Sequence, residues 1–134
     1  MPWASLATEP AADDAGKASA ATHLRQGIEL RKKGEFAPAE DELNQAIAAF
    51  PTAGLLYSER GQLRYLRRNY LGAIEDFNVY LAQVPSDAKI LLLRSQARRY
   101  ARPEDRPGAC ADFAALRQMD ASLSRIEGMD RYCR

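Results

Sequence analysis

The sequence contains few of the residues that build metal sites or nucleophilic centres. Its 134 residues include two cysteines and one histidine, His23, so no Cys or His group has the spacing of a zinc site. It has no glycine-rich phosphate loop and no Ser-His-Asp set. These absences argue against an enzyme, and we expect no catalytic residue, no metal site and no cofactor.

Strand-forming residues and long apolar runs are also scarce. Val, Ile and Thr are rare, whereas the good helix formers Ala, Leu, Arg and Glu make up much of the chain. No apolar run approaches the roughly 18 residues that a membrane span requires. The composition therefore predicts a helical protein without a membrane span.

Neither sign of charge is in excess. Nineteen Lys and Arg residues stand against 18 Asp and Glu residues, which gives a net charge of +1. This balance provides no overall attraction to nucleic acid or to an anionic membrane. Arginines near Arg67 and Arg98 leave nucleic-acid binding as an alternative, which the neighbouring acids oppose, so we expect no nucleic acid among the partners.

The N-terminal segment differs from the rest of the chain in composition. Met1 to Gly16 has neither a cationic stretch nor a hydrophobic one, so it does not read as a signal peptide. Its Pro, Ala, Ser and Asp content predicts a flexible segment over residues 1–16. We expect the first helix to begin between Asp13 and Ala18.

The strongest pattern in the sequence is an internal repeat. Sliding the chain by 34 residues aligns a small residue, an aromatic residue, a second small residue, a large apolar residue and a proline. Each of these types has a packing role, and the prolines would end a helix before the connection to the next unit. The aligned pairs are Gly27 with Gly61, Phe36 with Tyr70, Ala39 with Ala73, Leu43 with Phe77, and Pro51 with Pro85.

A third copy follows with a shift of two residues. The stretch from Gly108 to Phe113 matches the stretch from Gly72 to Phe77 at a spacing of 36. Residues 102–107 include two prolines and are the natural place for the insertion, since a surface turn accepts extra residues at little thermodynamic cost. In each unit, apolar residues at steps of three and four predict two helices.

This pattern resembles the tetratricopeptide repeat (TPR), a helix-turn-helix unit of 34 residues. The resemblance implies an all-α fold, a right-handed α-solenoid of three helix-turn-helix repeats at about residues 20–53, 54–87 and 88–121. A capping helix would follow at about residues 122–133, and residues 17–134 would form a single TPR domain. The sequence departs from the family pattern at His23, Arg64 and Arg98, where aromatic residues are usual, and at Ala121 in place of a terminal proline.

The resemblance also implies a function, because in this family the first helices of successive units line a concave groove for an extended peptide or a partner's helix. We therefore expect a protein–protein interaction scaffold or adaptor. The mixed chemistry of the implied groove favours a protein or peptide ligand with apolar anchors and some negative charge, although Arg and Lys are also common on solvated helix faces. The implied groove residues are Leu24, Ile28, Arg31, Lys32, Leu55, Ser58, Glu59, Gln62, Tyr65, Lys89, Leu92, Gln96 and Arg99.

One subtype of the family does not fit this sequence. Some members clamp the carboxylate tail of heat-shock chaperones with Lys, Asn and Arg side chains at five groove positions. Only Lys89 suits that role here, and Glu59 would repel the tail. The five corresponding positions hold Leu24, Ile28, Glu59, Lys89 and Leu93.

Arginines and an aspartate recur with the repeat and allow two interpretations. Arg60 and Arg64 are four residues apart on one helix face, and Asp76 lies on the second helix of the same unit. They could form an anion-binding strip, or they could pair within the unit as partly buried bidentate contacts. We favour pairing within the unit and predict a short contact between Arg60 and Asp76. The corresponding residues of the third unit are Arg94, Arg98 and Asp112.

The two cysteines also allow two interpretations. If the last helix folds back antiparallel, Cys110 and Cys133 could meet in a disulfide, which is worth about 2–4 kcal/mol for a loop of this length. The stretch around Cys110, with a second cysteine near the C-terminus, resembles extracytoplasmic bacterial repeat proteins. A periplasmic or otherwise extracytoplasmic localisation would follow, with a signal segment absent from this chain. Two reduced thiols in a cytoplasmic protein are the alternative.

Self-association is a further alternative. An exposed first helix could offer Leu24, Ile28 and Leu30 to a second copy, which would make a homodimer or a structural subunit of a bacterial envelope assembly. The sequence does not decide between a monomer and a dimer.

Overall fold

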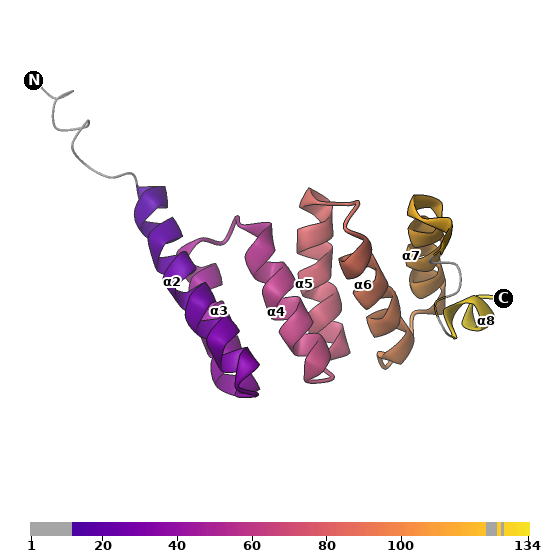
Figure 1. The fold of residues 1–134 in the computed structure, drawn as a ribbon, viewed down its shortest axis with the longest axis horizontal. Coiled ribbons are helices and arrows are strands. Elements are labelled where there is room, and N and C mark those ends of the chain that lie inside the picture. Colours follow the sequence, from indigo (N-terminus) through magenta and orange to yellow (C-terminus); the bar gives the residue numbers. More distant parts are fainter. Residues whose placement is uncertain (1–11, 123–125, 127) are drawn as a thin grey trace, which may run out of the picture. The chain divides into compact units, whose positions relative to one another are not determined.

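The computed structural model describes residues 12–122, 126 and 128–134, and all of its regular structure is helical. No strand occurs in these residues, as the prediction of an all-α fold of helix-turn-helix repeats requires. Figure 1 shows the helices in chain order. They are α2 (Ala12–Lys32), α3 (Phe36–Ala49), α4 (Gly54–Leu66), α5 (Tyr70–Gln83), α6 (Ala88–Tyr100), α7 (Arg106–Met119) and the short α8 (Met129–Tyr132).

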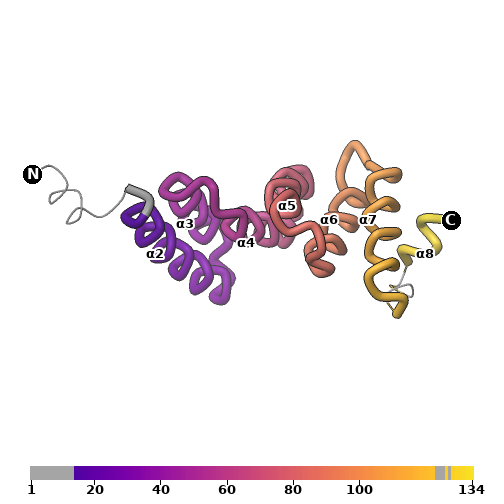
Figure 2. The backbone as a smooth tube through the Cα atoms, turned by 90° about the horizontal axis from the view of Figure 1, so that it is seen from above, coloured from indigo at the N-terminus to yellow at the C-terminus, as the bar shows by residue number. Residues whose placement is uncertain are grey.

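The chain divides into two compact units, residues 1–56 and residues 57–134. The first unit contains α2 and α3, and the second contains α5 to α8 together with most of α4. Within the units, α2 lies beside α3 and α6 beside α7 (Figures 1 and 2). The single domain over residues 17–134, with all its repeats in one stack, stays a prediction.

The helices begin and end at the signals in the sequence. The helix α3 ends at Ala49 and α5 ends at Gln83, each two residues before a proline, Pro51 or Pro85. This agrees with the terminating role of these prolines. The Asn69 side chain accepts the Gly72 N–H at 3.1 Å, and Asp105 accepts the Gly108 N–H at 2.9 Å. Such caps satisfy N–H groups that the first turn of a helix leaves unpaired.

Left-handed residues form the turns within the first two hairpins. Gly34 has a φ of 78° after α2, and Arg68 has a φ of 63° after α4. A left-handed residue at this position ends a helix and reverses the chain. In the third hairpin the predicted insertion forms the turn between α6 and α7, and Pro107 lies in the first turn of α7.

The first helix begins earlier than the composition of the N-terminal segment predicts. The helix α2 begins at Ala12, so residues 12–16 are helical and the flexible segment predicted over residues 1–16 is wrong at its C-terminal end. Ala12, Ala15 and Lys17 favour helix, and the acidic Asp13 and Asp14 suit its positive N-terminal end. Residues 1–11 lie outside the described residues.

In the first unit, small residues bring the two helices together. A Cβ at position 27 would lie 3.3 Å from the Ala39 carbonyl oxygen and 3.3 Å from Leu43. Ala39 is fully buried, and Ala20, Ala46 and Leu56 form the core beside it. Gly27 therefore allows α2 and α3 to approach closely, which is a packing role of the kind that the repeat predicts for this position.

The second unit repeats this contact around larger side chains. A Cβ at Gly61 would lie 2.7 Å from the Phe77 ring, so only glycine fits there without movement. Phe77 and Phe113 are fully or almost fully buried, one from each of two successive hairpins. A shared core therefore joins the α4–α5 and α6–α7 hairpins of this unit.

Within the predicted capping segment, residues 122–133, the structure describes an α-helix at Met129–Tyr132. The Asp120 carboxylate accepts both the N–H and the hydroxyl of Ser122, at 2.9 and 2.7 Å, which forms a turn where the helix was expected to begin. Gly128 then takes a left-handed conformation with a φ of 84°. Residues 123–125 and 127 lie outside the described residues.

Candidate functional site

The predicted groove residues of the first unit lie mostly along α2 and are only partly accessible. Leu24 packs against the core of this unit, and Ile28 and Arg31 are half-buried. Lys32 is exposed, and Leu55, at the start of α4, has 56% of its surface exposed. This unit therefore offers one exposed cation, which pairs with Glu29 at 3.7 Å, and one exposed leucine among the predicted residues.

In the second unit, the predicted residues lie on α4 and α6, and a hydrogen bond connects the two helices. The Tyr65 hydroxyl donates to Oε1 of Gln96 at 3.1 Å. Gln62 lies one turn before Tyr65 on α4 and is half-buried, whereas Lys89 on α6 is exposed. The geometry thus places α4 and α6 side chains on a common face, as the repeat pattern predicts for first helices.

Two of the predicted groove residues have other roles. Ser58 has only 3% of its surface exposed, and it accepts a hydrogen bond from Gln62 at 3.2 Å. Leu92 packs against the buried core of the second unit. Because the Ser58 side chain is buried and hydrogen-bonded, we remove it from the candidate site. The assignments of Glu59 and Leu92 to the groove stay predictions.

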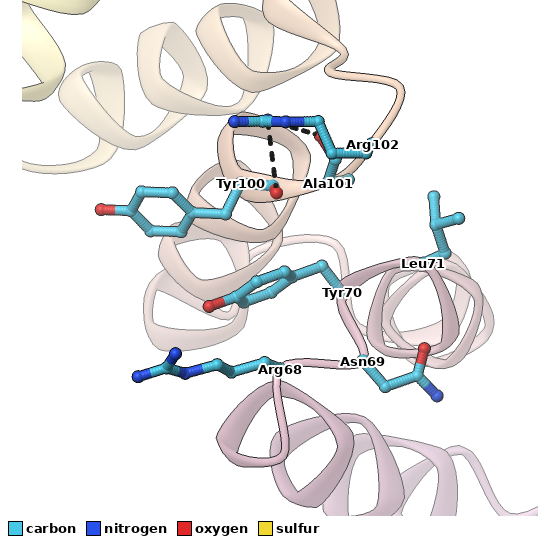
Figure 3. A pocket seen from close by; sticks show the side chains of 7 residues that line it. All are labelled: Arg68, Asn69, Tyr70, Leu71, Tyr100, Ala101 and Arg102. Carbon is cyan, nitrogen blue, oxygen red and sulfur yellow. Dashed lines mark hydrogen bonds between the residues drawn. The ribbon is translucent and has the colours of Figure 1, made fainter.

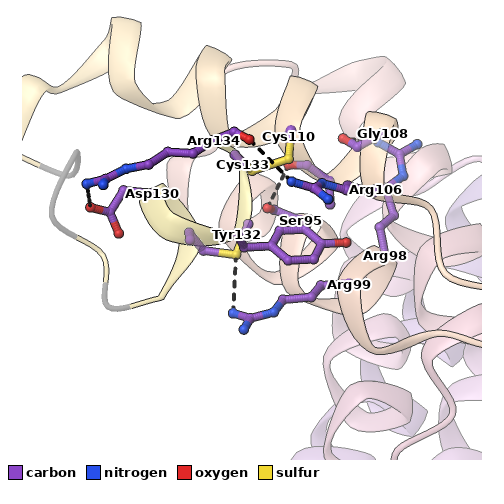
Figure 4. Close-up of a disulfide and its surroundings, with 12 residues drawn as sticks. Ser95, Arg98, Arg99, Arg106, Gly108, Cys110, Asp130, Tyr132, Cys133 and Arg134 are labelled. Carbon is purple, nitrogen blue, oxygen red and sulfur yellow. Dashed lines mark hydrogen bonds and ion pairs between the residues drawn. A yellow bond between two sulfur atoms is a disulfide. The ribbon is translucent and has the colours of Figure 1, made fainter.

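Arg99 is also occupied, because the C-terminal segment packs against it. Its guanidinium carbon lies 4.8 Å from the centre of the Tyr132 ring and 5.5 Å from that of Tyr100. One guanidinium nitrogen lies 3.9 Å from the sulfur of Met129, a fully buried side chain (Figure 4). Arg99 therefore holds the C-terminal segment as well as bordering the predicted groove.

Three tyrosines from three helices lie in a row beside this face. The Tyr65 and Tyr70 rings are 5.4 Å apart in an edge-to-face contact, and the Tyr70 and Tyr100 rings are 5.6 Å apart. Burial raises the pKa of Tyr65 to about 12, with smaller contributions from Tyr100 and Tyr70. Tyr65 therefore keeps its proton to a higher pH than an ordinary tyrosine does. Tyr100 was missed at the sequence level because it does not recur in the other repeats.

The recurring arginines pair within each hairpin. Arg60 makes a bidentate contact with Asp76, at 3.0 Å from Nε and 2.8 Å from Nη2, and Arg64 adds a third contact at 3.3 Å. Arg94 and Arg98 bind Asp112 at 2.7 to 2.9 Å in the same way. The predicted pairing is confirmed, and these arginines are not a free anion-binding strip.

His23 has a partner that the sequence did not reveal. Its Nδ1 lies 2.7 Å from a carboxylate oxygen of Glu42, on the other helix of the first hairpin. The two residues are 19 positions apart, and only the antiparallel pairing of α2 and α3 brings them together. His23 is therefore a structural contact of the first hairpin.

Cys110 and Cys133 are joined by a disulfide in the structure, with Cα atoms 5.5 Å apart (Figure 4). The bond ties the C-terminal segment to the first turns of α7. Tyr132 adds to this attachment, because its hydroxyl donates to Glu104 and its ring also packs against Arg106. Burial and the Glu104 carboxylate raise the pKa of Tyr132 to about 12.

In the described part of the chain, no three His, Cys, Asp or Glu side chains are placed to hold a metal ion. None of the helices described combines the length and the apolar character that crossing a bilayer needs. The polar side chains that the structure brings together at the candidate site are hydrogen-bond donors and acceptors suited to binding.

Comparison with known proteins supports the repeat interpretation. No protein-family model matches the chain. Human sperm-associated antigen 1 is 34% identical over 106 residues, which cover 73% of this chain and 11% of that protein. The chain thus spans about a tenth of the length of this relative. Because the relative is human, it gives no support to a bacterial origin or to an envelope assembly.

Solved structures with TPR domains have a similar fold. The first TPR of Spaghetti (RPAP3), bound to the HSP90 peptide SRMEEVD, has a TM-score of 0.74 and 19% identity, covering 87% of this chain and 91% of that one. The first TPR domain of human RPAP3 has a TM-score of 0.70 and 18% identity, over 85% of this chain and 91% of the other.

A third similar structure is the second TPR domain of human RPAP3 in complex with the HSP70 peptide SGPTIEEVD. Its TM-score is 0.69 at 18% identity, with 90% of this chain and 94% of that chain covered. Together with the repeat pattern and the helical hairpins, these similarities settle the class of the fold. The chain therefore has the fold of tetratricopeptide-repeat domains.

Proposed function

We propose that this domain is an adaptor that binds an extended peptide or a helix of another protein on the α4–α6 face of its second unit. The observation that supports this most directly is the hydrogen bond between Tyr65 and Gln96, which sets side chains of both helices on one face. Gln62 and the exposed Lys89 extend this face along the two helices. We define the α4–α6 face by Gln62, Tyr65, Lys89 and Gln96.

The chemistry of this face indicates the kind of ligand. An extended peptide has one backbone N–H and one C=O per residue. The Tyr65 oxygen and the Gln62 amide oxygen can accept from such N–H groups, and the Gln96 amide nitrogen can donate to the carbonyls. Lys89 adds a cation for a negative side chain. Two of the similar structures hold heat-shock peptides, which supports peptide binding as the general mode for this fold.

A heat-shock chaperone tail remains a poor ligand for this chain. Four of the five clamp positions hold Leu24, Ile28, Glu59 and Leu93, none of which can donate to a carboxylate. We therefore expect the peptide SRMEEVD to bind at least about tenfold more weakly than a ligand selected for this protein, a difference of about 1.4 kcal/mol.

Peptide selection tests the proposal and does not require the natural partner to be identified. A random peptide library displayed on phage would be selected against the full chain, and the affinity of the best peptide measured by calorimetry. Tyr65→Ala should weaken that affinity by about tenfold, because it removes a ring and a hydroxyl from the centre of the face. The control is Val79→Ala on α5, a partly exposed apolar residue outside the face. Equal affinities of the Tyr65→Ala variant and the wild type would refute binding on this face.

We also propose that the disulfide is present in the native protein, which suits an oxidising compartment. The alternative remains two reduced thiols in a cytoplasmic protein. Mass spectrometry of the protein isolated from its native source, after alkylation without reductant, distinguishes the two states. An unmodified Cys110–Cys133 pair supports the proposal, and two alkylated cysteines contradict it.

A further inference from the structure

The turn between α4 and α5 has an arginine where glycine would fit better. Arg68 has a φ of 63°, and the equivalent residue of the first hairpin is Gly34, with a φ of 78°. L-residues rarely adopt this left-handed conformation, because the Cβ crowds the backbone. Arg68 is exposed, so it does not hold this position through packing. A strained residue on a surface turn suggests that its side chain has a function there.

Arg68 borders a pocket in the second unit that lies outside the α4–α6 face. The pocket has a volume of about 350 Å³ and lies between the α4–α5 turn and the C-terminal end of α6. Figure 3 shows the side chains of Arg68, Tyr70, Tyr100 and Arg102 extending to the same side of the pocket, one above another. Two guanidinium groups thus flank two phenol rings whose centres are 5.6 Å apart.

The two arginines of this pocket lack the carboxylate partners that other arginines of the second unit have. Arg102 is oriented by its own backbone, because Nη1 donates to the carbonyls of Ala101 and Tyr100 at 2.9 and 3.4 Å. Among the residues that the structure describes, neither Arg68 nor Arg102 forms an ion pair.

The two acids that follow Arg102 in the sequence are engaged elsewhere. Glu104 accepts the hydroxyl of Tyr132. Asp105 caps α7 through the Gly108 N–H and lies 3.5 Å from Nε of Arg98. In the described part of the chain, the two positive charges of the pocket therefore have no carboxylate partner. The pocket also presents two tyrosine hydroxyl groups.

We propose that this pocket binds a carboxylate side chain of an acidic peptide segment. Guanidinium groups and phenol hydroxyls all donate to a carboxylate, and a planar guanidinium matches its two oxygens. The two rings and Leu71, which is 51% exposed, supply apolar walls for the methylene groups of a glutamate. These walls favour a carboxylate on an aliphatic stem over a bare phosphate. The site goes beyond the proposed α4–α6 face and does not depend on it.

Titration with a defined acidic probe tests the inference. Acetylated hexaglutamate is added to the ¹⁵N-labelled full chain at low salt, and the backbone amide shifts are followed. The largest changes should fall at residues 68–71 and 100–102. Arg68→Gly and Arg102→Gln should each weaken binding by about threefold, and together by about tenfold, as expected for exposed charge pairs. Arg68→Gly restores the residue type that the first hairpin has at this turn, so folding should be preserved.

Matched probes and variants make the outcome decisive. Arg67→Gln removes the same charge from the neighbouring residue, which does not line the pocket, and should leave the affinity within about twofold of the wild type. Neutral acetylated hexaglutamine should cause no shifts at the pocket. Equal weakening by Arg67→Gln, or shifts spread over all cationic surfaces, would overturn the proposal. So would inorganic phosphate or an oligothymidylate that shifts the same amides at a lower concentration than hexaglutamate.

Discussion

The first hairpin and the two later hairpins share their apolar contacts but differ in their polar ones. Small residues against large ones hold the hairpins together, with Gly27 against Leu43 in the first and Gly61 against Phe77 in the second. In each of the later hairpins, two arginines also form ion pairs with one almost fully buried aspartate. The first hairpin has Gln26 and Leu30 at the arginine positions, and its Glu42 contacts His23 instead. The repeat is therefore set by packing. The ionic lock, by which we mean two arginines bound to one aspartate, is an addition found in the two later hairpins.

Removing the aspartate of a lock should have the largest effect on stability. In an Asp112→Ala variant, Arg94 would lose its carboxylate and Arg98 would keep only Asp105, and both arginine side chains are less than one-fifth exposed. Breaking a buried ion pair from one side costs about 3–5 kcal/mol. Urea unfolding followed by circular dichroism measures the loss. Glu42→Ala in the first hairpin is the comparison and should cost no more than about 1 kcal/mol. Equal losses would show that the locks contribute no more than the His23–Glu42 contact.

The disulfide is a second difference between the two units, because the sequence of the first unit contains no cysteine. The Cys110→Ser and Cys133→Ser double variant should lose about 2–4 kcal/mol, the usual value for a loop of this size. Hydrogen exchange should become faster at Met129 to Tyr132 and stay unchanged in α2 and α3. Unchanged protection at Met129 would mean that its buried side chain, together with Arg99 and Tyr132, is enough to hold the segment.

The two hairpin turns should respond in opposite directions to exchange of their residue types. Arg68→Gly removes the steric strain of a left-handed L-residue. After the entropy cost of glycine, the variant should be more stable by about 0.5 kcal/mol, with a slightly higher melting temperature. Gly34→Ala introduces a Cβ at the equivalent position and should cost about 1 kcal/mol. Scanning calorimetry of the two variants checks the signs. A loss of stability in Arg68→Gly would mean that the arginine side chain stabilises the turn.

The last expected effect concerns pH and is the smallest at neutral pH, where it vanishes. The pKa of Tyr65 is raised to about 12 by burial, so the folded state keeps this proton more tightly than the unfolded chain, in which the pKa is near 10. The resulting stabilisation is complete below about pH 10 and is lost as the pH rises toward 12. Tyr65→Phe should therefore flatten the decline in stability over this range. A decline of unchanged steepness would contradict the raised pKa.

Features that repeat along the chain were predictable from the sequence. The 34-residue spacing of glycine, alanine and proline follows from packing rules that each hairpin must satisfy. The Arg60–Asp76 contact was predictable for the same reason, since a four-residue arginine spacing and an aspartate recur together. Such patterns are visible because one physical constraint acts several times.

Features that occur once were not predictable in the same way. The turn at Asp120 and the left-handed Gly128 lie at and within a segment that the family resemblance assigns to a capping helix. The contact of Arg99 with Tyr132 and the buried Met129 depends on the path of that segment. A family resemblance assigns Arg99 to the groove but contains no information about this C-terminal segment.

Binding at the α4–α6 face is tested most directly by the location of a bound peptide. A peptide selected from the library would be labelled with ¹³C, and intermolecular nuclear Overhauser effects to the protein recorded. We predict contacts to the side chains of Gln62, Tyr65 and Gln96. Contacts confined to α5 and α7, with none to these three residues, would contradict binding on this face.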